Sequence, residues 1–296
     1  MTGWLKLATE SANKTKDGVI HQLRKRIGGT EQGRSRSVLH ASDITKPYFC
    51  PRQEALLDQA GVLLGAPSFV GTAQRVTYDM GSLTAKNLIE NWAGDSVYGN
   101  WKCRRCNQQR TMTTKPGNGC GHSQDCIWEY REVVFKVEEY GLSGSVDALF
   151  NVGVPLLLIT ELKIMTPTEF DPLMAPLPEH RLRTNLYLRL AAQGKFIYDH
   201  MLNLNEGRVL YMSRGHGKKN EEHDGEIIPF KEYVVKRDDE GLDHILDKSK
   251  QLKVFRDTGA MPSGICNSIA DKAAKNCNMC KQCFSGLQPA EQEPIK

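Results

Sequence analysis

The segment Gly144-Ser145-Val146-Asp147-Ala148 and the triplet Glu161-Leu162-Lys163, whose acid lies fourteen residues after Asp147, decide how we interpret this chain of 296 residues. Residues two apart on a β-strand share a face, so Glu161 and Lys163 are expected to point the same way. Two charges at the end of an apolar stripe fit the mouth of a site better than a core. If the strand at 142–150 is the hairpin partner, Asp147 lies beside Glu161.

Two neighbouring carboxylates repel each other, and a hard divalent cation with oxygen ligands, Mg²⁺ or Mn²⁺, relieves that repulsion. A lysine beside such an ion would stabilise charge on a phosphate or orient the attacking water. The alternative is a plain salt bridge from Asp147 or Glu161 to Lys163 at an exposed strand end. The spacing alone leaves both interpretations open.

The elements around these residues predict an α/β protein with a mixed sheet flanked by helices. Three strands separated by turn residues predict an antiparallel meander over 132–138, 142–150 and 156–163. Further strands are expected at 208–213 and 227–235. Helices are expected from Pro51 onward, where proline suits the first helical position, and at 76–92, 178–202 and 242–256.

The composition is that of an ordinary globular chain, with 40% hydrophobic and 25% charged residues. It excludes a mainly disordered chain, and no apolar run reaches the roughly 20 residues of a membrane span. The N-terminus lacks the pattern of a secretory signal, so we expect a cytoplasmic protein without membrane partners. The net charge of +4 permits a nucleic-acid partner without demonstrating one.

Nine cysteines are the strongest compositional signal, and grouped thiols in a reducing cytosol are more often metal ligands than disulfides. A polar segment at 101–130 looks like an insertion and predicts a zinc-ribbon-like Zn²⁺ site with the ligands Cys103, Cys106, Cys120 and Cys126. His122 could replace Cys126. Basic residues with Trp101 and Trp128 fit contact with DNA, and a structural or protein-docking insertion fits equally.

The second group of cysteines is divided between the two ends of the chain: Cys50, Cys266, Cys277, Cys280 and Cys283. Cys50 directly precedes the expected helix at Pro51, and the others crowd near the C-terminus. Four such thiolates suit an iron–sulfur cluster and, on the residues alone, equally a zinc site. Either would clamp the helix after Cys50 to the C-terminal part of the chain.

Asp147 followed by Glu161-Leu162-Lys163 resembles the signature of the PD-(D/E)xK nucleases. The segment at 41–52, which contains Cys50, is similar to the entry of the iron–sulfur members of the RecB-like branch, including AddB-type nuclease domains and CRISPR-associated exonucleases. The helix with Arg183 and Tyr187 resembles the Gln-x-x-x-Tyr helix of that branch, with arginine where glutamine is usual. The resemblance covers residues 40–285 without the insertion.

This resemblance implies a restriction-endonuclease-like core and a Mg²⁺- or Mn²⁺-dependent deoxyribonuclease, acting as an exonuclease on DNA ends or single strands. Asp147, Glu161 and the backbone carbonyl of Leu162 would hold the catalytic ion, and Lys163 and Tyr187 would complete the catalytic set. Partners would be DNA and proteins of recombination, repair or CRISPR adaptation, in a cell or a phage.

The resemblance also implies a [4Fe–4S] cluster that joins the N- and C-terminal parts of the chain. Its ligands would be Cys50, Cys277 and Cys283, with Cys280 or Cys266 as the fourth. The expected domain organisation is a basic helical lead-in over 1–40, the nuclease domain over 41–285 and a flexible tail over 286–296.

One departure from the family concerns the early helix, where a histidine ligand usually follows a glycine by four residues. Here Gly81 is followed at that distance by Ala85. Glu90 is a candidate replacement ligand, although it also fits a solvated charge on the helix. Water could complete the coordination of the ion instead. The missing histidine keeps open an inactive nucleic-acid-binding or scaffold protein of the same fold. A structure-specific endonuclease is the third alternative.

Overall fold

The computed structural model describes residues 29–30, 38–61, 69–70, 72–117, 119–120, 125–153, 156–194, 201–215 and 228–285. The chain divides into two compact units, Met1–Arg36 with Val62–Thr84 and Ser37–Gly61 with Ala85–Lys296. In the first unit, β1 (Gly29–Thr30) pairs antiparallel with β3 (Phe69–Val70). The expected lead-in helix, the expected tail and His122 lie outside the described residues.

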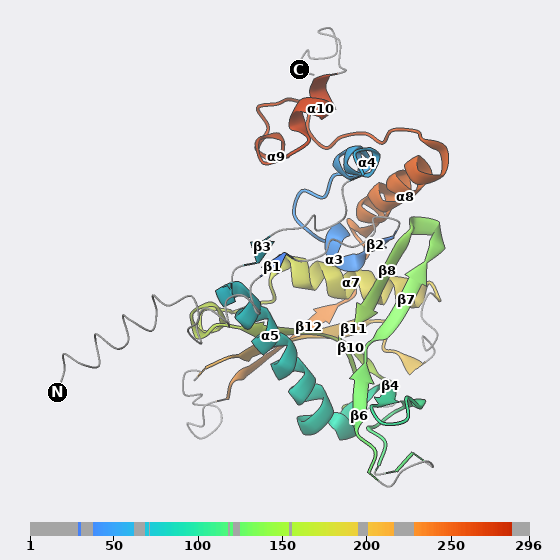
Figure 1. Cartoon of the computed structure of the whole chain (residues 1–296), viewed down its shortest axis with the longest axis vertical. Helices are drawn as coiled ribbons and strands as arrows, with labels where there is room; N and C mark the ends of the chain where they lie inside the picture. The colour runs from blue at the N-terminus through green and yellow to red at the C-terminus, as the bar shows by residue number, and fades with distance from the viewer. Residues whose placement is uncertain are drawn as a thin grey trace, which may run out of the picture. The chain divides into compact units, whose positions relative to one another are not determined.

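The second unit is built on a mixed sheet with the strand order β12-β11-β10-β9-β4-β5, in which β6 also pairs with β4. Its strands are β4 (Val97–Cys103), β5 (Gln109–Met112), β6 (Trp128–Arg131), β9 (Ala148–Phe150), β10 (Leu158–Met165), β11 (Glu206–Ser213) and β12 (Phe230–Lys236). β10 and β11 are parallel, and the other neighbours are antiparallel. This sheet and the helices around it confirm the predicted mixed α/β class (Figure 1).

A second, smaller sheet consists of β2 (Leu39–His40), β8 (Leu142–Val146) and β7 (Val133–Val137), in the order β2-β8-β7. The single strand expected at 142–150 is therefore wrong, because the chain bends at Asp147 and enters the large sheet as β9. At this bend the carboxylate of Asp147 accepts a hydrogen bond from the N–H of Leu162 on β10, a donor that a continuous ladder would pair with a backbone carbonyl. The meander is thus divided between two sheets.

The helices fall close to the expected ranges, with two differences at their ends. They are α3 (Ala41–Ile44), α4 (Pro51–Gln59), α5 (Thr72–Asn87), α6 (Pro167–Phe170), α7 (Pro178–Ala192), α8 (Leu242–Thr258), α9 (Lys272–Lys275) and α10 (Cys280–Ser285), with short turns η1 (Leu88–Trp92), η2 (Gly94–Ser96) and η3 (Glu138–Tyr140). The helix expected at 178–202 ends at Ala192, because Gly194 has a positive φ of 68°, and Leu202 forms a bridge with Leu157. The helix expected at 76–92 finishes as the π-helical turn η1.

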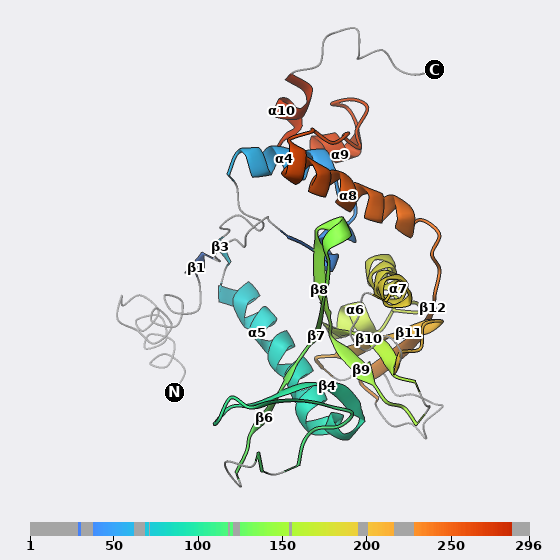
Figure 2. The ribbon, with the colours of Figure 1, turned by 90° about the vertical axis from the view of Figure 1, so that its right-hand side faces the viewer.

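The main core lies where α7 packs against β10 and β11, with α3 and α8 on its other sides. Residues 184–188 of α7 are all buried, as expected for a helix covered on every side. α8 packs along α4, and α10 lies close to α4 in both views (Figures 1 and 2). The core thus fixes one end of β10 against α7, and Glu161 lies at that contact. None of the described helices combines the length and apolar character needed to cross a bilayer.

Candidate functional site

The charged residues Glu161 and Lys163 of β10 lie beside the bend at Asp147. The ammonium Nζ of Lys163 lies 2.7 Å from Oε1 of Glu161 and 3.6 Å from Oδ2 of Asp147. Glu161 and Lys163 therefore share a face of the strand, and Asp147 reaches the same place from the neighbouring strand. We call Asp147, Glu161 and Lys163, together with Arg183, the acid site.

Asp147 is held by backbone geometry as well as by charge. Its Oδ2 accepts a hydrogen bond from the backbone N–H of Leu162, with 2.8 Å between nitrogen and oxygen. The carbonyl oxygen of Leu162 in turn accepts a hydrogen bond from Nζ of Lys163 at 3.0 Å. Burial, followed by the charge of Glu161, raises the pKa of Asp147 to about 6, although Lys163 and the N–H of Leu162 oppose this rise. The raised pKa therefore reflects first the burial of this carboxyl and then the nearby charge of a second acid.

Glu161 is 1% exposed and has unequal oxygens. Oε1 accepts a hydrogen bond from Nη1 of Arg183 at 2.6 Å and also contacts Nζ of Lys163. Oε2 is buried and has no hydrogen-bond partner among the described residues. Burying a carboxylate oxygen without a hydrogen-bond donor lowers the stability of the fold. A hard divalent cation would satisfy it, because carboxylate oxygens are ligands that such cations prefer. The donor set of the acid site therefore fits Mg²⁺ or Mn²⁺. Arg183 is an ion-pair partner of Glu161 that sequence reasoning did not assign.

Glu132 is an acid of this site that sequence reasoning missed. It lies directly before β7, and its Oε2 accepts a hydrogen bond from Oγ of Ser145 on β8. Burial and the charge of Asp147 raise the pKa of Glu132, while Ser145 and Lys163 act in the opposite direction. The signal that could have found it is the strand pairing itself, because a hairpin centred on 139–141 brings residue 132 opposite residue 147.

Helix α7 presents Tyr187 and His180 on either side of Arg183. Tyr187 is buried, packs edge-on against Phe135 with ring centroids 5.5 Å apart, and has its pKa raised by burial and by the charges of Glu161 and Asp147. Nδ1 of His180 lies 2.9 Å from the hydroxyl of Tyr211. Burial, with the charge of Lys163, lowers the pKa of His180 to about 4, so its imidazole is neutral at pH 7.

Glu90 has partners away from the acid site. It lies in η1, and its Oε1 accepts the N–H of Tyr130 in β6 at 2.8 Å and lies 3.8 Å from Nζ of Lys86. Its backbone carbonyl accepts Nζ of Lys115 at 2.7 Å. In the described structure, the carboxylate of Glu90 therefore anchors the insertion and makes no contact with Asp147.

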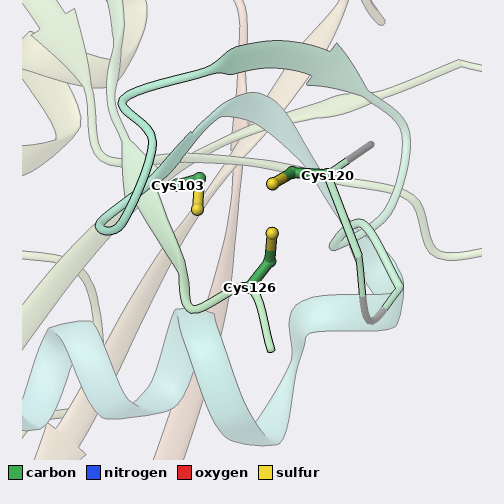
Figure 3. A group of neighbouring side chains, drawn as sticks. All are labelled: Cys103, Cys120 and Cys126. Atoms are coloured by element: carbon green, nitrogen blue, oxygen red, sulfur yellow. The ribbon is translucent and has the colours of Figure 1, made fainter. Parts of the chain in front are cut away.

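The insertion brings its cysteines together, and we call these residues with β4, β5 and β6 the cysteine knuckle. The ligand atoms of Cys103, Cys120 and Cys126 all lie within 4.8 Å of one another, and Figure 3 shows their sulfurs turned toward a common centre. Sγ of Cys106 lies 3.3 Å from Sγ of Cys120. The cluster could hold a metal ion such as zinc, since thiolates are ligands that Zn²⁺ prefers.

The surroundings lower the pKa of one knuckle thiol, Cys103, and raise the pKa of another, Cys126. The N–H of Cys106 donates to the sulfur of Cys103 and lowers the pKa of that thiol to about 6, as in a tight turn that directs amides at a thiolate. Burial and the neighbouring Cys120 and Cys103 raise the pKa of Cys126 to about 12. Crowded thiols of this kind need a cation before all of them can ionise.

The knuckle has a small core of its own, formed by Trp101, Cys103, Cys120 and Trp128. Trp101 is 0% exposed and Trp128 is 3% exposed, so the expectation that they stack on bases is wrong. Met112 and Ile127 of the insertion are exposed, so the two indole rings, with Tyr130 packed against them, supply the apolar surroundings of the cysteines. Arg110 lies over the Trp128 ring at 5.3 Å from its centroid, which leaves the basic residues as the outer surface of the knuckle.

The second group of cysteines lines one cavity of about 250 Å³ beside the N-terminus of α4. All five reach it: Cys50, Cys266, Cys277, Cys280 and Cys283. Its lining contains no Asp, Glu or His, and its polar side chains besides the thiols are those of Tyr48, Gln53 and Asn276. Burial, with the charges of neighbouring thiols, raises the pKa of Cys266, Cys277 and Cys283. Five thiols around one cavity fit an iron–sulfur cluster or zinc.

Comparison with known proteins leaves the chain without an assigned family. No protein-family model matches it, and no curated protein matches it. A solved structure titled "Crystal structure of SSO0001" is similar at 13% identity and a TM-score of 0.35, over 96% of this chain and 97% of that chain. A likeness of this strength does not identify a fold or a function.

Proposed function

We propose that this chain is a Mg²⁺- or Mn²⁺-dependent deoxyribonuclease with a PD-(D/E)xK core, acting as an exonuclease on DNA ends or single strands. The observation that carries the proposal is Lys163 lying between Asp147 and Glu161, next to a buried oxygen of Glu161 without a partner. A plain salt bridge would not require that second acid or leave that oxygen empty. The acid site therefore supports an ion site over a structural ion pair.

Each residue has a role that follows from its contacts. Asp147 and Glu161, with the carbonyl of Leu162, would hold the divalent ion, which activates water and stabilises charge on the phosphate when bound. Arg183 orients Glu161 through its 2.6 Å contact. Lys163 supplies an ammonium to the phosphate, and Tyr187 supports the wall behind the acids.

The two groups of cysteines complete the proposal as structural metal sites. Zn²⁺ in the knuckle would stabilise a segment with only a four-residue core. A [4Fe–4S] cluster in the five-cysteine cavity would tie Cys50 to the C-terminal helices, with Cys277, Cys283 and either Cys280 or Cys266. Anaerobic purification with quantified iron and zinc tests both assignments. Cys283→Ser should lower iron and the visible absorption while zinc stays, and Cys120→Ser should do the reverse.

The activity is tested with labelled linear DNA and the full-length protein in Mn²⁺, with and without chelator. We expect nucleotide release that requires Mn²⁺ and is lost in Lys163→Ala, while the matched control Lys250→Ala, at an exposed position on α8, keeps the rate. Degradation by Lys163→Ala at the wild-type rate would reject the assignment. Cutting of circular DNA would show the structure-specific endonuclease instead of the exonuclease.

A second candidate is a DNA-binding or scaffold protein of recombination, repair or CRISPR adaptation without turnover. Ala85, at the position where the family has histidine, favours it, because the ion loses a ligand there. The same assay separates the two candidates: DNA that is retained on the protein but never shortened in Mn²⁺ supports the binding protein.

A further inference from the structure

Helix α5 carries an apolar stripe that faces solvent. Val76, Met80 and Leu83 follow one another at helical spacing, and they are 39%, 51% and 66% exposed. In the described part of α5 from residue 74 to residue 87, no residue is buried. Helices in proteins owe most of their stability to the packing of such a stripe against a neighbour. The stripe on α5 therefore lacks a cover among the described residues.

The sequence contains a second amphipathic pattern before β1, at residues 19–27, which lie outside the described residues. Its apolar members recur at helical spacing: Val19, Ile20, Leu23 and Ile27. The basic residues at 24–26 fall outside this apolar stripe, as expected for an amphipathic helix with one face to cover. The chain thus supplies an apolar helical face of its own that could cover α5.

The β1–β3 pair brings these two segments to the same place. Gly29 pairs with Val70 and Thr30 with Phe69 in antiparallel register, so the chain that enters β1 arrives beside the chain that leaves β3. One residue separates position 27 from β1, and one residue separates β3 from the start of α5 at Thr72. Each connection spans at most about 3.6 Å, which keeps the ends of the two segments together. Both segments belong to the same compact unit.

We propose that the apolar stripe of α5 is a docking surface for residues 19–27 of the same chain, which pack on it as an antiparallel helix. A helix over 19–27 is about 13.5 Å long, and the stripe from Val76 to Leu83 is about 10.5 Å long, so the docked helix covers the whole stripe. In this arrangement Ile27 lies nearest the start of α5, and Ile20 lies nearest Leu83. The inference does not depend on the proposed function.

Hydrogen–deuterium exchange of the full-length, anaerobically purified protein, measured by mass spectrometry, tests this docking. We expect slow exchange of the amides at 19–27 and at 74–84 in the wild type. Leu23→Asp should make exchange at 74–84 about tenfold faster or more, because it places a charge in the covered face. His21→Asp is the matched control, since it adds a carboxylate on the opposite face of the 19–27 pattern, and it should leave 74–84 unchanged. The amides of α7 should keep their protection in both variants.

The reciprocal variants lie on α5. Met80→Asp should speed exchange at 19–27, whereas Ser82→Asp, at an exposed position outside the stripe, should not. Fast exchange at 74–84 in the wild type, or equal exchange at 74–84 in Leu23→Asp and the wild type, would overturn the proposal. Protection of 74–84 that requires a high protein concentration would overturn it in favour of a second copy of the chain. Protection that appears only with added DNA would overturn it in favour of DNA.

Discussion

The acid site and the cysteine knuckle are both candidate metal sites, but the chain holds them in different ways. The acid site is positioned by the ladders of two sheets and by the contacts of Arg183 with Glu161 and of Leu162 with Asp147, so its geometry exists before an ion binds. The knuckle thiols lie at the end of β4 and on the loops that follow it, and two of them, Cys103 and Cys120, belong to a core of only four buried residues. We therefore expect that removing the metal abolishes activity at the acid site without unfolding it, and unfolds the cysteine knuckle.

The largest expected effect separates activity from stability at the acid site. Asp147→Asn should lower Mn²⁺-dependent cleavage about a hundredfold or more, because the shared carboxylate is lost while the acceptor for Leu162 remains. The same variant should be more thermostable than the wild type at pH 7.5 without divalent ions. Cleavage rates and melting temperatures of both proteins check this pair of results.

The pH dependence of the stability gained by Asp147→Asn follows from the direction in which the pKa of Asp147 is shifted. The pKa of Asp147 is raised from 3.8 to about 6, so the folded wild type loses stability as the pH rises through this interval. Asp147→Asn avoids that loss, and the two melting temperatures should converge below about pH 4. A variant that is equally destabilised at every pH would contradict the picture of repelling acids. Asp247→Asn, at an exposed position on α8, is the control.

The next effect concerns the knuckle. Cys120→Ser should lose the knuckle metal, because Cys120 is one of the three thiols within 4.8 Å of one another. Protease cleavage should then appear between residues 103 and 128, while the core of α7 and β10 stays protected. Limited proteolysis with mass spectrometry measures this, and Cys283→Ser is the control that should leave the segment resistant. Equal protection in Cys120→Ser would show that the knuckle folds without metal.

A pair of glycines compares the packing behind the two sites. A Cβ on Gly144 would lie 2.6 Å from Cζ of Phe135, whereas a Cβ on Gly117 would meet nothing within 4 Å. Gly144→Ala should therefore lower the free energy of unfolding by about 1–3 kcal/mol. Gly117→Ala, in the knuckle, should stay within about 0.5 kcal/mol of the wild type. Denaturant unfolding of the two variants measures the contrast, and equal effects would show that the small sheet is loosely packed.

The smallest effect lies at the attachment of the knuckle. Lys86, and then Arg104, lower the pKa of Glu129 from 4.5 to about 2, so Glu129 stabilises the fold above pH 4.5 and this contribution is lost as the pH falls toward 2. Glu129→Gln should be slightly less stable than the wild type at pH 7, and the difference should vanish near pH 2. Thermal melts across this range check it, with Glu138→Gln expected to follow the wild type.

The sequence predicts the faces of strands better than the partners of strands. The period of two in β10 correctly sets Glu161 and Lys163 on one side, and proline correctly begins α4 at Pro51. The break at Asp147 was not predictable, because there the side chain accepts a hydrogen bond from the backbone N–H of Leu162, fifteen residues later on β10. Periodicity carries no information about such a contact.

The site itself was predictable only where its residues share one strand or one hairpin. Arg183 reaches Glu161 from α7 through a packing arrangement that no local pattern encodes. Glu132 was accessible in principle, because its position follows from the register of one hairpin, but register depends on the turn that closes it. Trp101 was misjudged because an aromatic residue among basic ones has the same pattern whether it is buried or exposed.

The central claim is that Asp147 and Glu161 converge on one divalent ion beside Lys163. The most direct measurement is an anomalous difference map from crystals of the full-length protein grown in Mn²⁺. The account predicts a peak within about 2.0–2.3 Å of carboxylate oxygens of both Asp147 and Glu161. Ordered side chains at both acids with no peak between them would contradict it.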